Sequence, residues 1–121
     1  MNDIIETIDL GSYKGFDLKL NALVEYMTVS DSFDMDEKEM NDIYNKLDRY
    51  ELMWFCANVS AYKNGIKLSD DYLGGCLYES LEKFINDGDY IEDMKETVIK
   101  EAKQVIQQLI QPFLVLQKKE L

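Results

Sequence analysis

The dipeptide Asn64-Gly65 is the feature that most constrains how this chain folds. Asn and Gly favour a type I′ turn, whose backbone twist matches that of two antiparallel strands. Before the turn, side chains alternate between two faces, as in a strand. One face carries Met53, Phe55, Ala57, Val59 and Ala61, and the other carries Leu52, Trp54, Cys56, Asn58, Ser60 and Tyr62. The turn pairs Lys63 with Ile66 and Ala61 with Leu68. The sequence therefore predicts a hairpin that buries Phe55, Ala57, Val59, Ala61, Ile66 and Leu68.

Helical spacing dominates the segments on both sides of this hairpin. Asp34 and Glu37 form a capping-box pattern, and the apolar stripe Met40, Ile43, Tyr44 and Leu47 predicts a helix at 35–48 that faces the core. After a turn at 70–76, a short helix carrying Leu77, Leu81, Phe84 and Ile85 is expected to end at Gly88. Asp89 and Glu92 repeat the capping pattern, and the apolar spacing then predicts a long helix over 90–110 that ends near Pro112.

Residues 1–33 fit two interpretations. Phe16, Leu18 and Leu20 alternate with polar residues after a Gly-containing loop at 11–15, which favours a hairpin up to about residue 21. Phe16, Leu20, Leu23, Val24 and Met27 also fall on one helical face. We favour strands. Because strands and helices then follow one another with neither linker nor repeat, we expect residues 1–121 to form a single α+β domain. Its antiparallel sheet should have three to four strands, with helices packed on one face.

The charge of the chain restricts its partners. There are 24 acidic and 13 basic residues, which give a net charge of −11. Such a surface repels phosphate, so we expect neither direct nucleic-acid binding nor attraction to an anionic membrane, and a protein with a basic surface is the natural partner. Two cysteines are too few for a disulfide scaffold, and the N-terminus does not resemble a signal peptide. The sequence therefore predicts a cytoplasmic protein.

Catalytic and metal-binding patterns are absent from the sequence. There is no histidine, so the commonest general base and zinc ligand are missing. Cys76 follows Gly74-Gly75 at a predicted helix start, where a thiol pKa can fall, but it is more simply interpreted as a buried structural residue. Two carboxylate clusters, at 31–42 and 87–93, do not match the EF-hand order. We therefore expect no catalytic residue, no metal site, no cofactor and no enzymatic activity.

Three surfaces remain as candidates for binding. The first is an acidic one: Asp34, Asp36, Glu37, Glu39 and Asp42 on the helix at 35–48, supported by Glu92, Asp93 and Glu96 on the last helix. The second is the side of the hairpin that carries Trp54 and Tyr62, which either is covered by another segment or forms an aromatic interface. The third is the apolar tail 113–116, which either tucks onto the domain or is buried in a second subunit, making a homodimer possible.

In its small size, its acidity and its lack of catalytic motifs, the chain resembles the small anti-CRISPR and anti-restriction inhibitors of phages and mobile elements. The resemblance is one of type, without an alignable motif, and it assigns no site residues. It implies that rows of Asp and Glu stand in for DNA phosphates and occupy the basic channel of a host defence nuclease. The alternative is a homo-oligomeric accessory or assembly protein of a phage or mobile element that binds through apolar patches.

Overall fold

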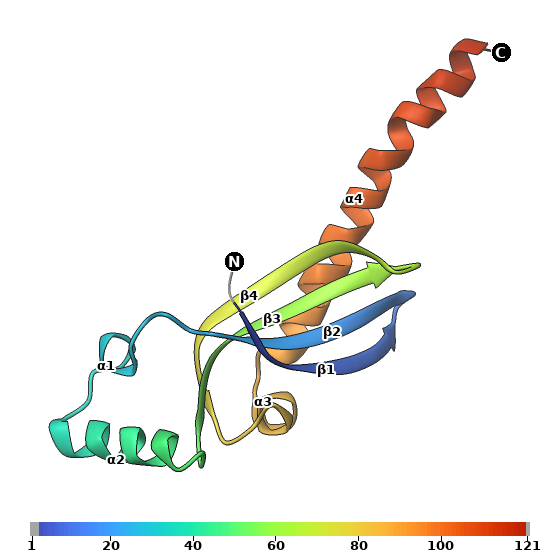
Figure 1. The fold of residues 1–121 in the computed structure, drawn as a ribbon. Helices are drawn as coiled ribbons and strands as arrows, with labels where there is room; N and C mark the ends of the chain where they lie inside the picture. The colour runs from blue at the N-terminus through green and yellow to red at the C-terminus, as the bar shows by residue number, and fades with distance from the viewer. Residues whose placement is uncertain (1–2, 121) are drawn as a thin grey trace.

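The computed structural model describes residues 3–120 (Figure 1). The strands are β1 (Ile4–Tyr13), β2 (Phe16–Leu23), β3 (Met53–Lys63) and β4 (Ile66–Tyr78). The helices are α1 (Val29–Ser32), α2 (Glu37–Asp48), α3 (Leu81–Asp87) and α4 (Ile91–Glu120). The strands form one antiparallel sheet in the order β1-β2-β3-β4, and α3 and α4 pack against one of its faces (Figure 1). The predicted α+β class and antiparallel sheet are confirmed.

Both hairpins close through two-residue turns whose residues have positive φ. Asn64 and Gly65 have φ values of 50° and 78°, as a type I′ turn requires, and Lys63 pairs with Ile66 as predicted. Lys14 and Gly15 make the equivalent turn between β1 and β2. The strand interpretation of the N-terminal region is therefore confirmed, but the predicted loop at 11–15 is wrong: β1 continues to Tyr13, so the connection is only Lys14-Gly15, and β2 extends to Leu23.

The predicted register of the β3–β4 hairpin is correct for Lys63–Ile66 and Tyr62–Lys67 and wrong from Ala61 on. A bulge between Ala61 and Tyr62 makes Ala61 pair with Ser69 instead of Leu68. Ile66 lies beyond this bulge at the tip of the hairpin, where its side chain is 64% exposed, and it is not part of the core. Leu68 is half-buried and packs against the core cluster. A bulge adds one residue to a strand and resets the alternation, which is why Ser69 and not Leu68 lies opposite Ala61. Ile66 keeps its predicted pairing with Lys63 and is exposed because it lies at the tip of the hairpin.

The core lies between the sheet and α4. Alternate side chains of β2 and β3 are buried on the sheet face that contacts α4. The side chains of α4 that face the sheet form the other layer of the core. The members of the core include Leu18, Leu20, Ala22, Phe55, Ala57, Val59, Ala61, Ile91, Met94, Val98, Ile99 and Ala102. At the sheet–helix interface, the Ser69 hydroxyl donates a hydrogen bond of 2.7 Å to the backbone carbonyl of Val98. The predicted burial of Phe55, Ala57, Val59 and Ala61 is confirmed.

The helix α2 differs from its prediction in both its start and its packing. The N-cap is Asp36, whose carboxylate accepts a hydrogen bond of 2.8 Å from the backbone N–H of Glu39, so the cap lies two residues after the predicted Asp34. Among the twelve residues of α2, none is buried. Figure 1 shows α2 beyond the end of the sheet, on the opposite side of the molecule from the free end of α4. Its apolar stripe is thus half-covered and does not belong to the core.

Two further predictions about the C-terminal half are wrong. Cys76 and Leu77 belong to β4, which bends at Gly74-Gly75 and continues to Tyr78, so neither residue lies in a helix. The short helix begins only at Leu81, after its N-cap Ser80, and ends at Gly88 as predicted. The long helix does not end at Pro112 but runs through it to Glu120. Pro112 cannot donate to the carbonyl of Gln108, yet Gln108 is exposed on this helix and its carbonyl can bind water instead.

Candidate functional site

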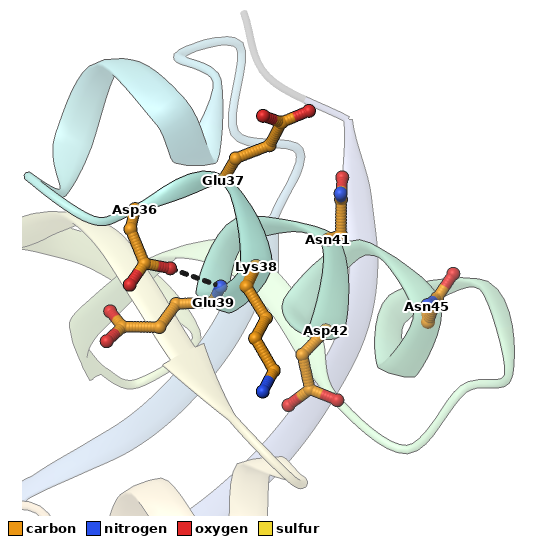
Figure 2. Close-up of a pocket in the computed structure, with 7 residues that line it drawn as sticks. All are labelled: Asp36, Glu37, Lys38, Glu39, Asn41, Asp42 and Asn45. Carbon is orange, nitrogen blue, oxygen red and sulfur yellow. Dashed lines mark hydrogen bonds between the residues drawn. The ribbon is translucent and has the colours of Figure 1, made fainter.

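The acidic ridge is the set of five carboxylates that the structure places at the start of α2. All five side chains are exposed. The ridge consists of Asp34, Asp36, Glu37, Glu39 and Asp42. Figure 2 shows four of them: Asp36, Glu39 and Asp42 point to one side of the helix, and Glu37 points to the other. Because no residue of α2 is buried, these carboxylates are accessible, and with Lys38, Asn41 and Asn45 they line an open pocket.

The ridge is held in position by the helix itself. Asp36 caps the first turn, and Glu37 and Glu39 lie in that turn, where the positive end of the helix dipole favours negative charge. At the other end of the ridge, Asp42 forms an exposed ion pair of 3.2 Å with Lys46. Within residues 3–120, no group of three Asp, Glu or Cys side chains is arranged to hold a metal ion. The ridge can therefore offer negative charge to a partner.

The predicted supporting carboxylates lie on a different element from the ridge. Glu92, Asp93 and Glu96 are exposed in the first turns of α4, which packs on the sheet. Glu96 accepts hydrogen bonds from the hydroxyl of Tyr13 and from the ammonium of Lys14, the latter at 2.7 Å. These bonds, with the Lys14 bond first among them, lower the pKa of Glu96. Glu96 thus joins α4 to the β1–β2 turn, and its negative charge is paired with the positive charge of Lys14.

Trp54 is covered by another segment of the chain. Its indole N–H donates a hydrogen bond of 2.8 Å to the backbone carbonyl of Met27, and its ring packs against Phe33 at a centroid distance of 5.9 Å. Nearby, the carboxylate of Glu25 accepts a hydrogen bond of 2.6 Å from the backbone N–H of Gly75. These contacts fasten the segment that carries α1 and α2 to the sheet. Of the two alternatives for Trp54, the structure supports coverage.

Tyr62 lies near the opposite end of β3 and belongs to a different surface from Trp54. The ammonium of Lys19 lies 5.0 Å from the centre of its ring. Tyr62 also lines a hollow of about 400 Å³ on the sheet face that does not contact α4. The other residues that line this hollow are Ile4, Asn21, Leu23, Asn58, Lys67 and Tyr72. Trp54 and Tyr62 therefore do not form a common aromatic patch.

A line of hydrogen bonds crosses all four strands on this face, and no local sequence pattern predicts it. Thr7 of β1 donates to Asn21 at 2.6 Å, and Asn21 donates to Asn58 at 2.9 Å. Asn58 donates to Asp70 of β4 at 3.0 Å. Asn58 and Asn21 are only 3% and 8% exposed, so these partners satisfy polar groups that would otherwise be costly to bury. The polar residues Asn58 and Ser60 within an otherwise apolar strand were the available signal.

Asp70 is the charged end of this network. Burial alone would raise its pKa, but hydrogen bonds from Lys67, Ser60 and Asn58 together outweigh burial and hold the pKa below its ordinary value. The Lys67 ammonium lies 2.8 Å from the carboxylate, and the Ser60 hydroxyl lies 2.6 Å from it. The carboxylate is thus ionised and internally paired, which makes the network part of the architecture of the sheet.

The C-terminal part of α4 is the third candidate surface, and it does not tuck onto the domain. The helix has 30 residues, about 45 Å, and its last turns extend beyond the sheet (Figure 1). Large apolar side chains there are exposed by 45% to 67%. They are Leu109, Ile110, Phe113, Leu114 and Leu116. Of the two alternatives for the tail, packing onto its own domain is excluded.

Cys76 is buried in β4, with 4% of its surface exposed. Burial raises the pKa of its thiol to about 11, so the thiol is protonated near neutral pH and is a poor nucleophile. Burial also raises the pKa of Cys56, which lies on β3. Both thiols are free.

The chain matches no protein-family model, no curated protein and no solved structure. Among the helices within residues 3–120, none is both long enough and apolar enough to cross a membrane.

Proposed function

We propose that this protein is a non-enzymatic binding protein that occupies a basic, nucleic-acid-binding surface of another protein through the acidic ridge. One observation carries the proposal: α2 lies outside the core and presents all five carboxylates of the ridge to solvent. A helix that served only to cover the core would bury its apolar stripe, and α2 buries none of its residues. Its exposed charges are therefore available to a partner.

The spacing of charge on the ridge is close to that of a nucleic acid. Asp36, Glu39 and Asp42 point to one side of α2 and follow one another every three residues, or about 4.5 Å along the helix axis (Figure 2). This spacing is of the same order as the ~3.4 Å per charge along one DNA strand. A basic channel that binds a phosphate backbone would attract such a surface, and the attraction would speed encounter and weaken with salt.

The resemblance to phage and mobile-element inhibitors supports a nuclease of a host defence system as the class of partner. In this proposal the protein acts in the cytoplasm, where free thiols such as Cys56 and Cys76 remain reduced. Inhibition would follow from occupancy alone, because a blocked channel cannot admit DNA.

Affinity capture from bacterial lysate tests the proposal. The immobilised protein should retain a nucleic-acid-binding enzyme at low salt, release it as salt rises, and lose it when duplex DNA is added as a competitor. The matched variants are Glu39→Lys with Asp42→Lys in the ridge, which keep the Asp36 cap of α2, and Glu6→Lys with Glu101→Lys outside it. Both double variants change the net charge equally, and all four side chains are exposed. Capture should survive the second set and be lost with the first, whereas equal capture by both would refute the ridge.

A second candidate function, that of a homo-oligomeric accessory or assembly protein, is favoured by a separate observation. The end of α4 exposes five large apolar side chains, between 45% and 67% each. Contiguous apolar surface of this kind marks interaction sites in water-exposed proteins. In this alternative the apolar surface of α4 makes the functional contact. The negative charge of the ridge only keeps copies of the protein from aggregating.

A further inference from the structure

The apolar stripe of α4 continues past the edge of the domain. Ile99 and Ala102 are buried against the sheet, and Ile106 is half-buried at its edge. Leu109, Phe113 and Leu116 continue the stripe at spacings of three, four and three residues from Ile106. This is the heptad spacing of positions that pack between two helices. We name Ile106, Leu109, Phe113 and Leu116 the apolar seam.

The charge along α4 indicates what can cover the seam. Residues 102–119 contain three lysines and no Asp or Glu. The other residues hold all 24 acidic and the remaining 10 basic side chains. The seam therefore lies on an exposed helical segment from which negative charge is missing, so a second copy can approach it without carboxylates meeting across the contact.

We propose that the seam pairs with the seam of a second copy as an antiparallel helix pair. In an antiparallel pair, Ile106 opposes Leu116 of the second copy, and Leu109 opposes Phe113, so all four seam residues find apolar partners in one register. A parallel pair would place the two strongly acidic domains side by side. The antiparallel pair places them at opposite ends, where their repulsion is screened over more than one Debye length.

The size of the seam sets the strength of this contact. The exposed seam side chains Leu109, Phe113 and Leu116 carry on the order of 350 Å² per copy, so a pair covers about 700 Å², which is the size range of weak, transient contacts. We therefore expect a dimer that dissociates in the micromolar range and responds to dilution. The inference deepens the second candidate function, and it is independent of the acidic ridge. If both hold, one dimer presents two ridges at its far ends.

Sedimentation equilibrium of the purified chain tests the pairing. Wild-type protein should sediment as a concentration-dependent dimer. The variant Leu109→Asp with Phe113→Asp should weaken the dimer about a hundredfold or more, because both central contacts are lost. The matched control, Gln107→Asp with Gln111→Asp, adds the same charge to the outer side of the same helix and should leave the dimer intact. A wild-type monomer at every concentration, or equal dimerisation of the seam variant and wild type, would overturn the proposal.

Disulfide trapping tests the orientation. Mixing chains that carry Ile106→Cys with chains that carry Leu116→Cys should give a mixed cross-linked dimer, because an antiparallel pair places these positions opposite each other. Chains with Leu109→Cys alone should not cross-link. Efficient cross-linking of the Leu109→Cys chain to itself would show a parallel pair, and a dimer in which neither cross-link forms would show a different interface. Each of these results would overturn the antiparallel pairing of the seam. None of them bears on the ridge, because the seam variants do not alter it and its own variants test it separately.

Discussion

Phe55 lies in an aromatic cluster at the centre of the core. Its ring meets Phe84 of α3 edge-on at 5.8 Å and lies 6.3 Å from Tyr78 at the end of β4. Phe55 is fully buried, so its removal would leave a cavity between the sheet and α3. At the scale of single residues, this cluster joins β3, β4 and α3.

We predict that Phe55→Ala lowers the free energy of unfolding by about 3–5 kcal/mol, since it combines lost burial with an unfilled cavity. Ile66→Ala serves as the control. That side chain is 64% exposed at the tip of the hairpin, so its loss should cost less than about 1 kcal/mol. Urea denaturation of both variants measures the difference, and similar losses would show that the burial of Phe55 and the exposure of Ile66 are not as the structure has them.

Cys76 gives the molecule a thiol that should respond to unfolding. Its pKa of about 11 in the folded chain exceeds the ~8.5 of a free thiol. Because folding disfavours the thiolate, stability should be unaffected by this group below about pH 8.5 and should fall as the pH rises toward 11. Alkylation at pH 8 should be slow in the native protein and fast in urea. Fast alkylation of the native protein would place Cys76 outside the core and would reopen the possibility of thiol chemistry.

At the scale of elements, the sequence predicted the features that depend on neighbouring residues, such as turns and the alternation of side chains along a strand. The Asn64-Gly65 turn and the alternation of β3 were sufficient to place a hairpin and four of its core residues. The position of α2 could not be predicted in this way, because an amphipathic stripe shows that a helix has an apolar face but not what covers it. The bulge between Ala61 and Tyr62, the bend at Gly74-Gly75 and the helix through Pro112 also depend on tertiary context.

The candidate site shows the same division. The carboxylates of the ridge were predicted as exposed, and they are exposed. The partner of Trp54 is the carbonyl of Met27, which lies 27 residues earlier in the chain, and no local pattern identifies such a contact. Likewise, the line of hydrogen bonds from Thr7 to Asp70 becomes visible only when the strands are assembled.

We predict that α2 exchanges its amide hydrogens much faster than β3 and the first half of α4. Helical hydrogen bonds that lie outside the core open without unfolding the rest of the protein, so their protection is low. Hydrogen–deuterium exchange of the free protein, followed by mass spectrometry, measures this directly. Protection of residues 37–48 equal to that of β3 would mean that α2 is packed more firmly than its exposure indicates.

At the scale of the whole molecule, three surfaces lie apart from one another and differ in chemistry. The ridge on α2 is acidic, the hollow on the open sheet face combines internally bonded polar side chains with apolar and aromatic ones, and the end of α4 is apolar. Figure 1 places α2 and the free end of α4 at opposite ends of the molecule. A partner bound at α2 and a second copy bound at α4 would therefore not compete for space.

The same exchange measurement on the protein bound to its captured partner tests the proposed function most directly. Because α2 exchanges fast when free, contact with a partner should produce a large and local change. We predict that exchange slows in residues 36–48 on binding, and that this protection is lost in the variant with Glu39→Lys and Asp42→Lys, which keeps the Asp36 cap. Protection confined to the open sheet face or to α4, with α2 unchanged, would contradict it.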